Sequence, residues 1–281
     1  MTLEATVSIG WVNTVIGAAE RLSLNADQLL AEAGIPEAAC ELERWPIDDI
    51  TRLWHAAERI TGDPGFGLKV GAEFSPMSIS GVGFALQSAA TLREAIVMVQ
   101  RFQRLISDGG RFQIVAGNTA TWLVYHPRQG RLAFSPHQIE AVLASVVGFG
   151  SWVTGTRMQP SRVQFSQPRL GPLAGYQTVF NCPVEFEQAF SGVQIDNAVL
   201  DQPLPQADPQ LAQVHERYTN ARLAALSINS ASVPEIRRWL NARVGPVLPR
   251  RADAAKALGI SERSLARRLR EQGKTFDALV D

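Results

Sequence analysis

In the first 110 residues, apolar side chains recur three or four positions apart, which is the spacing of a helix face. The predicted helices cover residues 7–21, 26–33, 46–60 and 92–106. Gly34 ends the second helix, and Thr91 with Glu94 forms a capping box at the start of the fourth. In such a box the hydroxyl and the carboxylate each bind a backbone N–H that the helix leaves free. The first third of the chain is therefore expected to be helical.

Beyond residue 110 the helical spacing gives way to short runs of β-prone residues. The runs 111–116 and 120–126 flank a Gly-Asn-Thr turn and predict a hairpin. Ser135 and Pro136 suit the N-cap and first residue of a helix. Further strands are expected at residues 162–165, 184–186 and 192–195, and helices at 136–153 and 173–180. Helices packed on an antiparallel sheet make an α+β domain, the fold class expected here.

The last 80 residues have a different organisation. A Pro-rich stretch at residues 202–209 indicates the exit from the first domain, and a connecting helix is predicted at 210–226. Ser232 begins a Ser-Val-Pro-Glu cap for a helix to about residue 243. Two short helices at 251–258 and 262–272 then flank a three-residue turn, which is a helix-turn-helix pattern. An all-α helix-turn-helix domain is therefore expected to follow the α+β domain.

We predict three parts from these patterns. Residues 1–205 form the α+β domain, residues 206–231 a connecting helix or linker, and residues 232–281 the helix-turn-helix domain.

The turn of the predicted helix-turn-helix has a physical role for each residue. Gly259 can adopt the left-handed conformation that ends the first helix, Ile260 can enter the core, and Ser261 can cap the second helix. One apolar seam is formed by Ala255, Leu258, Ile260, Leu265 and Leu269. The opposite, outer face of the second helix carries Arg263, Ala266, Arg267 and Arg270.

The neutral formal charge of the chain hides an uneven distribution. Residues 232–281 contain eleven basic and six acidic residues, whereas the rest of the chain contains 16 basic and 21 acidic ones. A basic end on an acidic body attracts a polyanion locally, which favours a reader of double-stranded DNA.

The expected DNA-binding residues are Arg263, Arg267, Arg270, Ser261, Arg268 and Arg250. Arg263 and Arg267 are expected at base edges, because a guanidinium can hold guanine O6 and N7 with two hydrogen bonds. Arg268 lies nearer the apolar seam and is expected to reach a phosphate or a carboxylate of its own domain. Arg250, before the first helix, is expected near a phosphate.

Composition narrows the function classes. The chain is 46% hydrophobic and 19% charged, with no long apolar run and no leader, so we expect a folded cytoplasmic protein without a membrane span. Cys40 and Cys182 have no partner motif and are expected to be buried. The four histidines lack metal-ligand spacing, and the common nucleophile and phosphate-binding motifs are missing. We therefore expect no catalytic residues, no metal, no cofactor and no enzyme activity.

Residues 258–276 resemble the first helix-turn-helix of the AraC/XylS family of bacterial regulators. The resemblance rests on the turn, on Ser261-Glu262-Arg263-Ser264-Leu265 and on Gly273-Lys274-Thr275-Phe276. Residues 61–68, 91–95 and 181–186 are similar to the arabinose-binding-type sensor domain of one branch of that family. The resemblance implies that residues 1–205 sense a small-molecule effector and form a homodimer, that residues 232–281 bind DNA, and that the protein has no enzyme activity. The family carries two helix-turn-helix units joined by a long helix, and Asp281 stands where that helix would begin, so we expect a chain truncated after the first unit.

Three functions follow in order of support. The leading one is a ligand-responsive activator or repressor. The alternative is an N-terminal domain that only dimerises or binds a partner, without a small-molecule site, and the third is an enzyme with a DNA-binding tail. The sequence names no effector-binding residue, but a pocket lined by Trp and Phe is expected between the sheet and the helices. For Trp122 and Trp152, packing is expected rather than a ligand cage.

Overall fold

The computed structural model describes residues 5–79, 82–241, 250–257, 261–271 and 274–280. The chain divides into two compact units, Glu4–Asn220 and the residues from Ala221 on, and each is described by itself. The division between the two units falls inside the helix Pro209–Asn241. It does not test the predicted domain boundaries at residues 205 and 231, which stay predictions. Among the described residues, no helix combines the length and the apolar character needed to span a membrane.

A five-stranded sheet forms one layer of the larger unit, in the order β3-β4-β7-β5-β6. Its strands are β3 (Gly110–Ala116), β4 (Ala120–Pro127), β5 (Arg162–Gln164), β6 (Val184–Glu185) and β7 (Ser191–Asp196). The predicted hairpin is confirmed, with Gly110 opposite Pro127 and Ala116 opposite Thr121. The sheet is antiparallel except for β5 and β6, which run parallel because the connection between them, with α8 (Leu173–Phe180), returns to the same end of the sheet.

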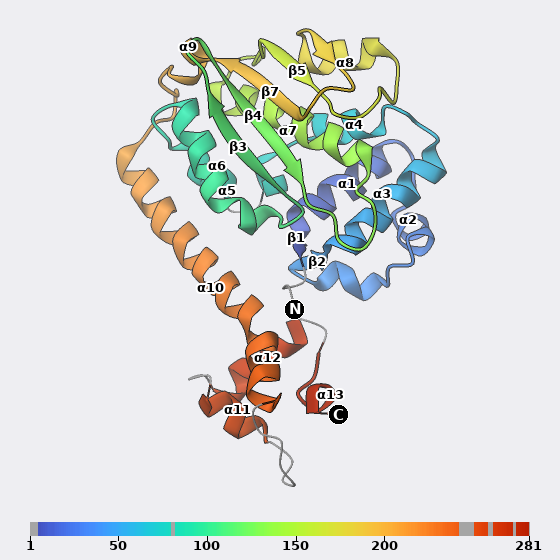
Figure 1. The fold of residues 1–281 in the computed structure, drawn as a ribbon, viewed down its shortest axis with the longest axis vertical. Helices are drawn as coiled ribbons and strands as arrows, with labels where there is room; N and C mark the ends of the chain where they lie inside the picture. The colour runs from blue at the N-terminus through green and yellow to red at the C-terminus, as the bar shows by residue number, and fades with distance from the viewer. Residues whose placement is uncertain (1–4, 80–81, 242–249, 258–260, 272–273, 281) are drawn as a thin grey trace. The chain divides into compact units, whose positions relative to one another are not determined.

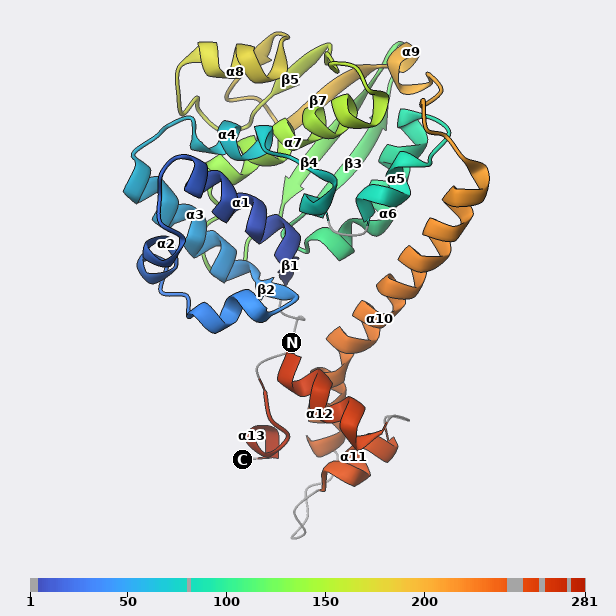
Figure 2. The ribbon, with the colours of Figure 1, turned by 180° about the vertical axis from the view of Figure 1, so that it is seen from behind.

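Helices cover one face of this sheet. Figure 1 shows the sheet in front of α7 (Pro136–Thr154), and Figure 2 shows α7, α4 (Phe66–Ala72) and α1 (Ile9–Arg21) from the other side. The remaining helical elements of this unit are α2 (Ala26–Glu32), η1 (Glu37–Glu41), α3 (Ile47–Thr61), η2 (Pro76–Ile79), α5 (Val82–Gln87), α6 (Leu92–Ile106) and α9 (Asn197–Leu200). The predicted α+β architecture is confirmed.

Two predicted helices begin later than expected. A short two-stranded sheet pairs β1 (Thr6–Ser8) with β2 (Arg44–Pro46), so residues 7 and 8 precede α1 and Pro46 precedes α3. Helical spacing had assigned residues 7, 8 and 46 to the helix ends. Their backbone groups instead take part in strand pairing, in which Val7 lies opposite Trp45, 38 residues away.

Of the two predicted N-caps, the one before α6 forms and the one before α7 does not. At the start of α6, Thr91 Oγ1 accepts from Glu94 N at 3.2 Å, and the Glu94 carboxylate accepts from Ala90 N at 2.7 Å. At the start of α7, Ser135 makes no side-chain capping bond, and its buried hydroxyl has no hydrogen-bond partner among the described residues. Burial of Cys40 was also wrong, because η1 buries only its Ala39 and leaves Cys40 exposed. Cys182 is half-buried, and burial raises the pKa of its thiol to about 11.

Helix α10 (Pro209–Asn241) is much longer than the predicted connecting helix. It begins one residue earlier, because the Asp208 carboxylate accepts from Gln210 N at 2.9 Å and Leu211 N at 3.0 Å. It continues through residues 232–235, where a new helix was expected to start. Residues 227–235 are rich in serine and include Pro234, so local helix propensity does not account for this continuation. The later helices are α11 (Arg251–Ala257), α12 (Glu262–Glu271) and α13 (Asp277–Val280).

Two glycines allow α4 to approach α7 at backbone distance. A Cβ on Gly67 would lie 2.3 Å from the carbonyl oxygen of His137. A Cβ on Gly71 would lie 2.4 Å from the Cβ of Ala144 and 2.5 Å from the carbonyl oxygen of Ala141. Any side chain at either position must therefore push the two helices apart.

Gly71→Ala is expected to lower the free energy of unfolding by roughly 1–3 kcal/mol, because the added methyl group overpacks the contact between α4 and α7. Gly17→Ala in α1 is the matched control, since its nearest neighbour is the flexible end of Arg21 at 3.6 Å. The control is expected to raise stability by about 0.5–1 kcal/mol. Denaturant unfolding of the two variants measures both, and equal effects would contradict the proposed close packing.

Candidate functional site

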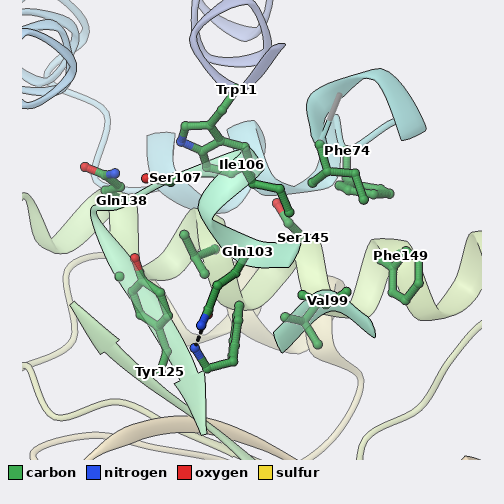
Figure 3. A pocket seen from close by; sticks show the side chains of 15 residues that line it. Trp11, Phe74, Val99, Gln103, Ile106, Ser107, Tyr125, Gln138, Ser145 and Phe149 are labelled. Carbon is green, nitrogen blue, oxygen red and sulfur yellow. Dashed lines mark hydrogen bonds between the residues drawn. The ribbon is translucent and has the colours of Figure 1, made fainter. Parts of the chain in front are cut away.

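A pocket of about 120 Å³ lies in the larger unit between the sheet and helices α1, α6 and α7. Fifteen residues line it, and Figure 3 shows side chains from the sheet and from several helices around the same cavity. The expectation of a pocket between sheet and helices is confirmed. The sequence had named none of its residues.

Helical spacing explains how two helices supply most of the wall. From α7, the lining residues follow one face at spacings of three and four: Gln138, Val142, Ser145, Val146 and Phe149. From α6, Val99, Gln103 and Ile106 do the same. This periodicity could have identified the faces from sequence, but it could not have shown that they enclose a space.

Aromatic rings make up much of the remaining surface, as expected. The rings are Trp11, Phe74, Phe112, Tyr125 and Phe149. Phe74 and Phe149 meet edge to face with centroids 6.1 Å apart, and Phe112 lies 5.2 Å from Tyr125. Burial raises the pKa of Tyr125 far above its usual range, so this ring stays a neutral phenol.

Most polar side chains on the lining already have protein partners. Gln103 Oε1 accepts from Phe112 N at 2.9 Å (Figure 3), and Ser145 Oγ donates to the carbonyl of Ala141 at 2.7 Å. Ser107 Oγ accepts from Gly109 N at 2.9 Å. Gln138 differs, because it is 2% exposed and its Oε1 has no hydrogen-bond partner in the described part of the chain. A buried, unpaired amide oxygen costs stability unless something else donates to it.

The tryptophans singled out from the sequence lie outside this lining. Trp122 packs edge to face on Phe190 with centroids 5.3 Å apart, and Trp152 lies 6.2 Å from Phe149. Both tryptophans thus pack against another aromatic ring, but each is half-buried and not part of the core that was expected to hold it. Trp11, which the sequence had not distinguished from the others, is the indole at the pocket.

Helix α7 also carries a buried polar cluster outside the pocket lining. His137 and Glu140 are both nearly inaccessible, with His137 Nδ1 3.7 Å from Glu140 Oε2. The hydroxyl of Tyr176 in α8 donates to Glu140 Oε1, and burial together with this bond raises the pKa of Tyr176. Leu170 N donates to the same hydroxyl at 3.2 Å. The cluster joins α7 to α8. No pattern around His137 in the sequence had indicated this role.

The α5–α6 segment connects the pocket wall to the first turns of α10. Arg101 lies two residues from both Val99 and Gln103, so it points to the opposite side of α6. Its guanidinium pairs with Glu216 and donates to Asn220 Oδ1 at 3.1 Å. The hydroxyl oxygen of Ser88, just after α5, lies 3.2 Å from Nδ1 of His215 in α10. Helix α6 therefore contacts the pocket on one side and α10 on the other.

In the second unit, α11 and α12 pack through the expected apolar seam. Ala255, Leu265 and Leu269 are buried, as are Ala254 and Phe276. Leu258 and Ile260, also assigned to the seam, lie outside the described residues, as does Gly259 of the turn. The Ser261 carbonyl accepts from Leu265 N at 2.9 Å, which is the N-cap position of α12.

The arginines predicted to bind DNA lie mostly on accessible surface. Arg263, Arg267 and Arg270 of α12 are exposed, opposite the buried Leu265 and Leu269. Arg250 is exposed just before α11, and its carbonyl accepts from Asp253 N and Ala254 N, so it occupies the N-cap position. Arg268 lies within α12, but its side chain is outside the described part. An ion pair of 3.3 Å between Arg251 and Glu262 links the two helices.

The chain matches known proteins along most of its length. Residues 24–204 match the family model of the arabinose-binding domain of AraC transcription regulators, N-terminal. The ornithine utilization regulator of Pseudomonas aeruginosa is 28% identical over 233 residues, which are 83% of this chain and 68% of that protein. The regulator VirS of Mycobacterium tuberculosis, named as HTH-type, is 24% identical over 82% of this chain and 68% of its own length.

A solved structure shares the fold. The transcriptional regulator CdpR from Pseudomonas aeruginosa superposes with a TM-score of 0.51 at 19% identity, covering 90% of this chain and 79% of that one. The relatives are named as transcriptional regulators, and none is named as an enzyme. The chain thus belongs to the AraC family of transcription regulators, in the branch with the arabinose-binding N-terminal domain.

Proposed function

We propose that this regulator binds double-stranded DNA through α12 and responds to a small-molecule effector held in the pocket between sheet and helices. The proposal rests on helix α6. One side of this helix lines the pocket, and the other side is paired with α10 through Arg101 and Glu216. Because α10 runs on toward the helix-turn-helix in sequence, a ligand that displaces α6 has a mechanical route to the DNA reader.

The surface of α12 supports the DNA-binding part. Its apolar side is buried in the helix-turn-helix core, which leaves Arg263, Arg267 and Arg270 on the accessible side. A helix of this kind fits the major groove, where arginine distinguishes guanine from the other bases. Ser261, Arg268 and Arg250 complete the proposed contact set, with Arg250 at a phosphate.

The pocket supports effector sensing over the alternative of a purely structural N-terminal domain. Binding would favour one of two arrangements of α6 and α10, which is the minimum that an allosteric response requires. The name of the Pseudomonas relative refers to ornithine. Ornithine would not suit this pocket, because the fifteen lining residues include no charged side chain to pair with its ionic groups.

The proposed homodimer has a candidate surface on α10. Leu211, Val214 and Tyr218 are exposed at 44%, 52% and 56%, and their spacing places them on one side of the helix. Ala221 and Ala225, both exposed, continue the same heptad pattern. An apolar stripe of this spacing is complementary to a second copy of itself, so two chains related by a twofold axis would cover it.

Arg267→Ala is expected to weaken binding to a selected cognate duplex by roughly 1–3 kcal/mol and to relax preference at one base pair, because a base-edge contact is lost. Arg250→Ala is the matched comparison. It is expected to weaken binding to all sequences similarly and to flatten the salt dependence, because a phosphate contact is lost. Titrations at several salt concentrations, on selected and scrambled duplexes, separate the two effects.

The contrast between the two variants decides the assignment. If Arg267→Ala lowers affinity for both duplexes equally, that arginine contacts backbone rather than base. If neither change alters binding, α12 is not the DNA-reading helix.

Val214→Glu is expected to raise the dissociation constant of the homodimer at least roughly tenfold, since the twofold axis would bury two unpaired carboxylates. Leu173→Glu, on the exposed side of α8, is the control and should leave the dimer intact. Light scattering on the full chain at tens of micromolar measures the mass of each protein. A monomeric parent chain, or equal dissociation of both variants, would contradict this interface.

A further inference from the structure

We infer that the ion pair between Arg251 of α11 and Glu262 of α12 withholds one arginine from the DNA backbone, and so limits the sequence-independent affinity of this regulator for DNA. The inference rests on the proposed function, since α12 has to enter the major groove for α11 to meet the backbone. Glu262 thereby sets how strongly DNA is held, and not which sequence is preferred.

Both partners stand at the first residue of a helix. Arg251 begins α11 and Glu262 begins α12. Arg251 Nε donates to Glu262 Oε2 at 3.3 Å, and about half of each side chain is exposed. One residue along a helix is a rotation of about 100°, so Glu262 lies beside the outer face that begins with Arg263, on the flank toward α11. The pair therefore lies at the edge of the proposed DNA-reading surface.

Arg250, one residue earlier in the chain, provides the comparison. It is exposed at the N-cap of α11 and forms no ion pair with any residue that the structure describes. In a helix-turn-helix complex the first helix crosses the DNA backbone while the second enters the groove, so Arg250 and Arg251 are both expected near phosphates. Of the two, Arg251 has a carboxylate beside it. Their contributions to DNA binding should differ for that reason.

Cancellation of charge matters here more than the strength of the ion pair. An exposed ion pair is weak, so Arg251 can turn away from Glu262 at little cost. The carboxylate nevertheless remains at the start of α12, where it repels any phosphate that the guanidinium approaches. A neutral pair releases no counterion from DNA, whereas one uncompensated arginine at a phosphate steepens the slope of log affinity against log salt by about 0.9. The pair thus subtracts about one phosphate contact from the total.

Sequence preference should not depend on this pair. Phosphate contacts hold every sequence alike, whereas the bases are distinguished by side chains in the groove. The arginines assigned to base edges, Arg263 and Arg267, lie on the outer face of α12 rather than on its flank. Removal of the Glu262 charge is therefore expected to raise affinity for specific and non-specific DNA by the same factor.

Glu262→Gln is the test, because it removes the charge and keeps an amide oxygen that can still accept from Arg251. The full chain is titrated with a duplex selected from a random pool and with its scrambled counterpart, at salt concentrations from about 50 to 200 mM. The slope should steepen by about 0.9, and at about 100 mM salt both duplexes should bind roughly fivefold tighter. The ratio of the two affinities should stay within about twofold of the parent value.

Two further variants separate a released arginine from a general loss of negative charge. Asp277 is an exposed acid at the first residue of α13 and has no ion pair in the described part of the chain. Asp277→Asn removes the same charge, and its slope should stay within about 0.3 of the parent value. The double variant Arg251→Gln with Glu262→Gln should also keep the parent slope, because no arginine is left there to reach a phosphate.

An unchanged slope in Glu262→Gln would overturn the inference. A double variant as steep as Glu262→Gln alone would overturn it too, since the effect would then not come from Arg251. Thermal unfolding without DNA checks that each variant is folded at the titration temperature, and the midpoints should lie close to that of the parent because the pair is exposed. A parent chain that binds neither duplex would overturn the proposed function and this inference together, whereas a parent chain that binds both overturns this inference alone if Glu262→Gln has no effect.

Discussion

The contact between α4 and α7 is the constraint on which the rest of the α+β domain depends. At Gly67 and Gly71 the two helices approach so closely that a single methyl group would collide with the backbone of α7. Protein interiors are packed densely enough that such a collision cannot be absorbed locally. Because α4 is held there, α7 keeps its position between the α4 layer and the sheet. Its pocket-facing residues and its buried His137–Glu140 cluster are positioned as a consequence.

Helix α7 buries several polar side chains, some of them paired and some not. Glu140 is bonded to Tyr176 and lies beside His137, which ties α7 to α8. In the described part of the chain, Gln138 Oε1, Glu140 Oε2 and, just before the helix, the Ser135 hydroxyl are buried without hydrogen-bond partners. Each unpaired buried group lowers stability. Unsatisfied polar atoms therefore lie along α7 both at the pocket and away from it.

Helix α6 links the pocket to α10, through which the chain leaves the α+β domain. Val99 and Gln103 face the pocket, whereas Arg101 between them pairs with Glu216 of α10. The segment before α10 is held by the same neighbourhood, since Leu204 N donates to the carbonyl of Ala90 and Asp208 N to that of Ser88. The two sides of α6 therefore contact different parts of the chain.

The sequence by itself determined the local structure and the arginine-rich face of α12. Helical spacing located α6 and α7, the Gly-Asn-Thr turn located the β3–β4 hairpin, and the Leu265–Leu269 seam fixed the side of α12 on which Arg263 and Arg267 lie. These features depend on interactions between residues close in the chain, so periodicity and capping chemistry are sufficient. Tertiary structure decided the β1–β2 pairing, the parallel β5–β6 edge and the pocket. Each of these joins distant segments or depends on space left unfilled between them, and a single glutamine such as Gln138 has no local signal to show that its amide is buried without a partner.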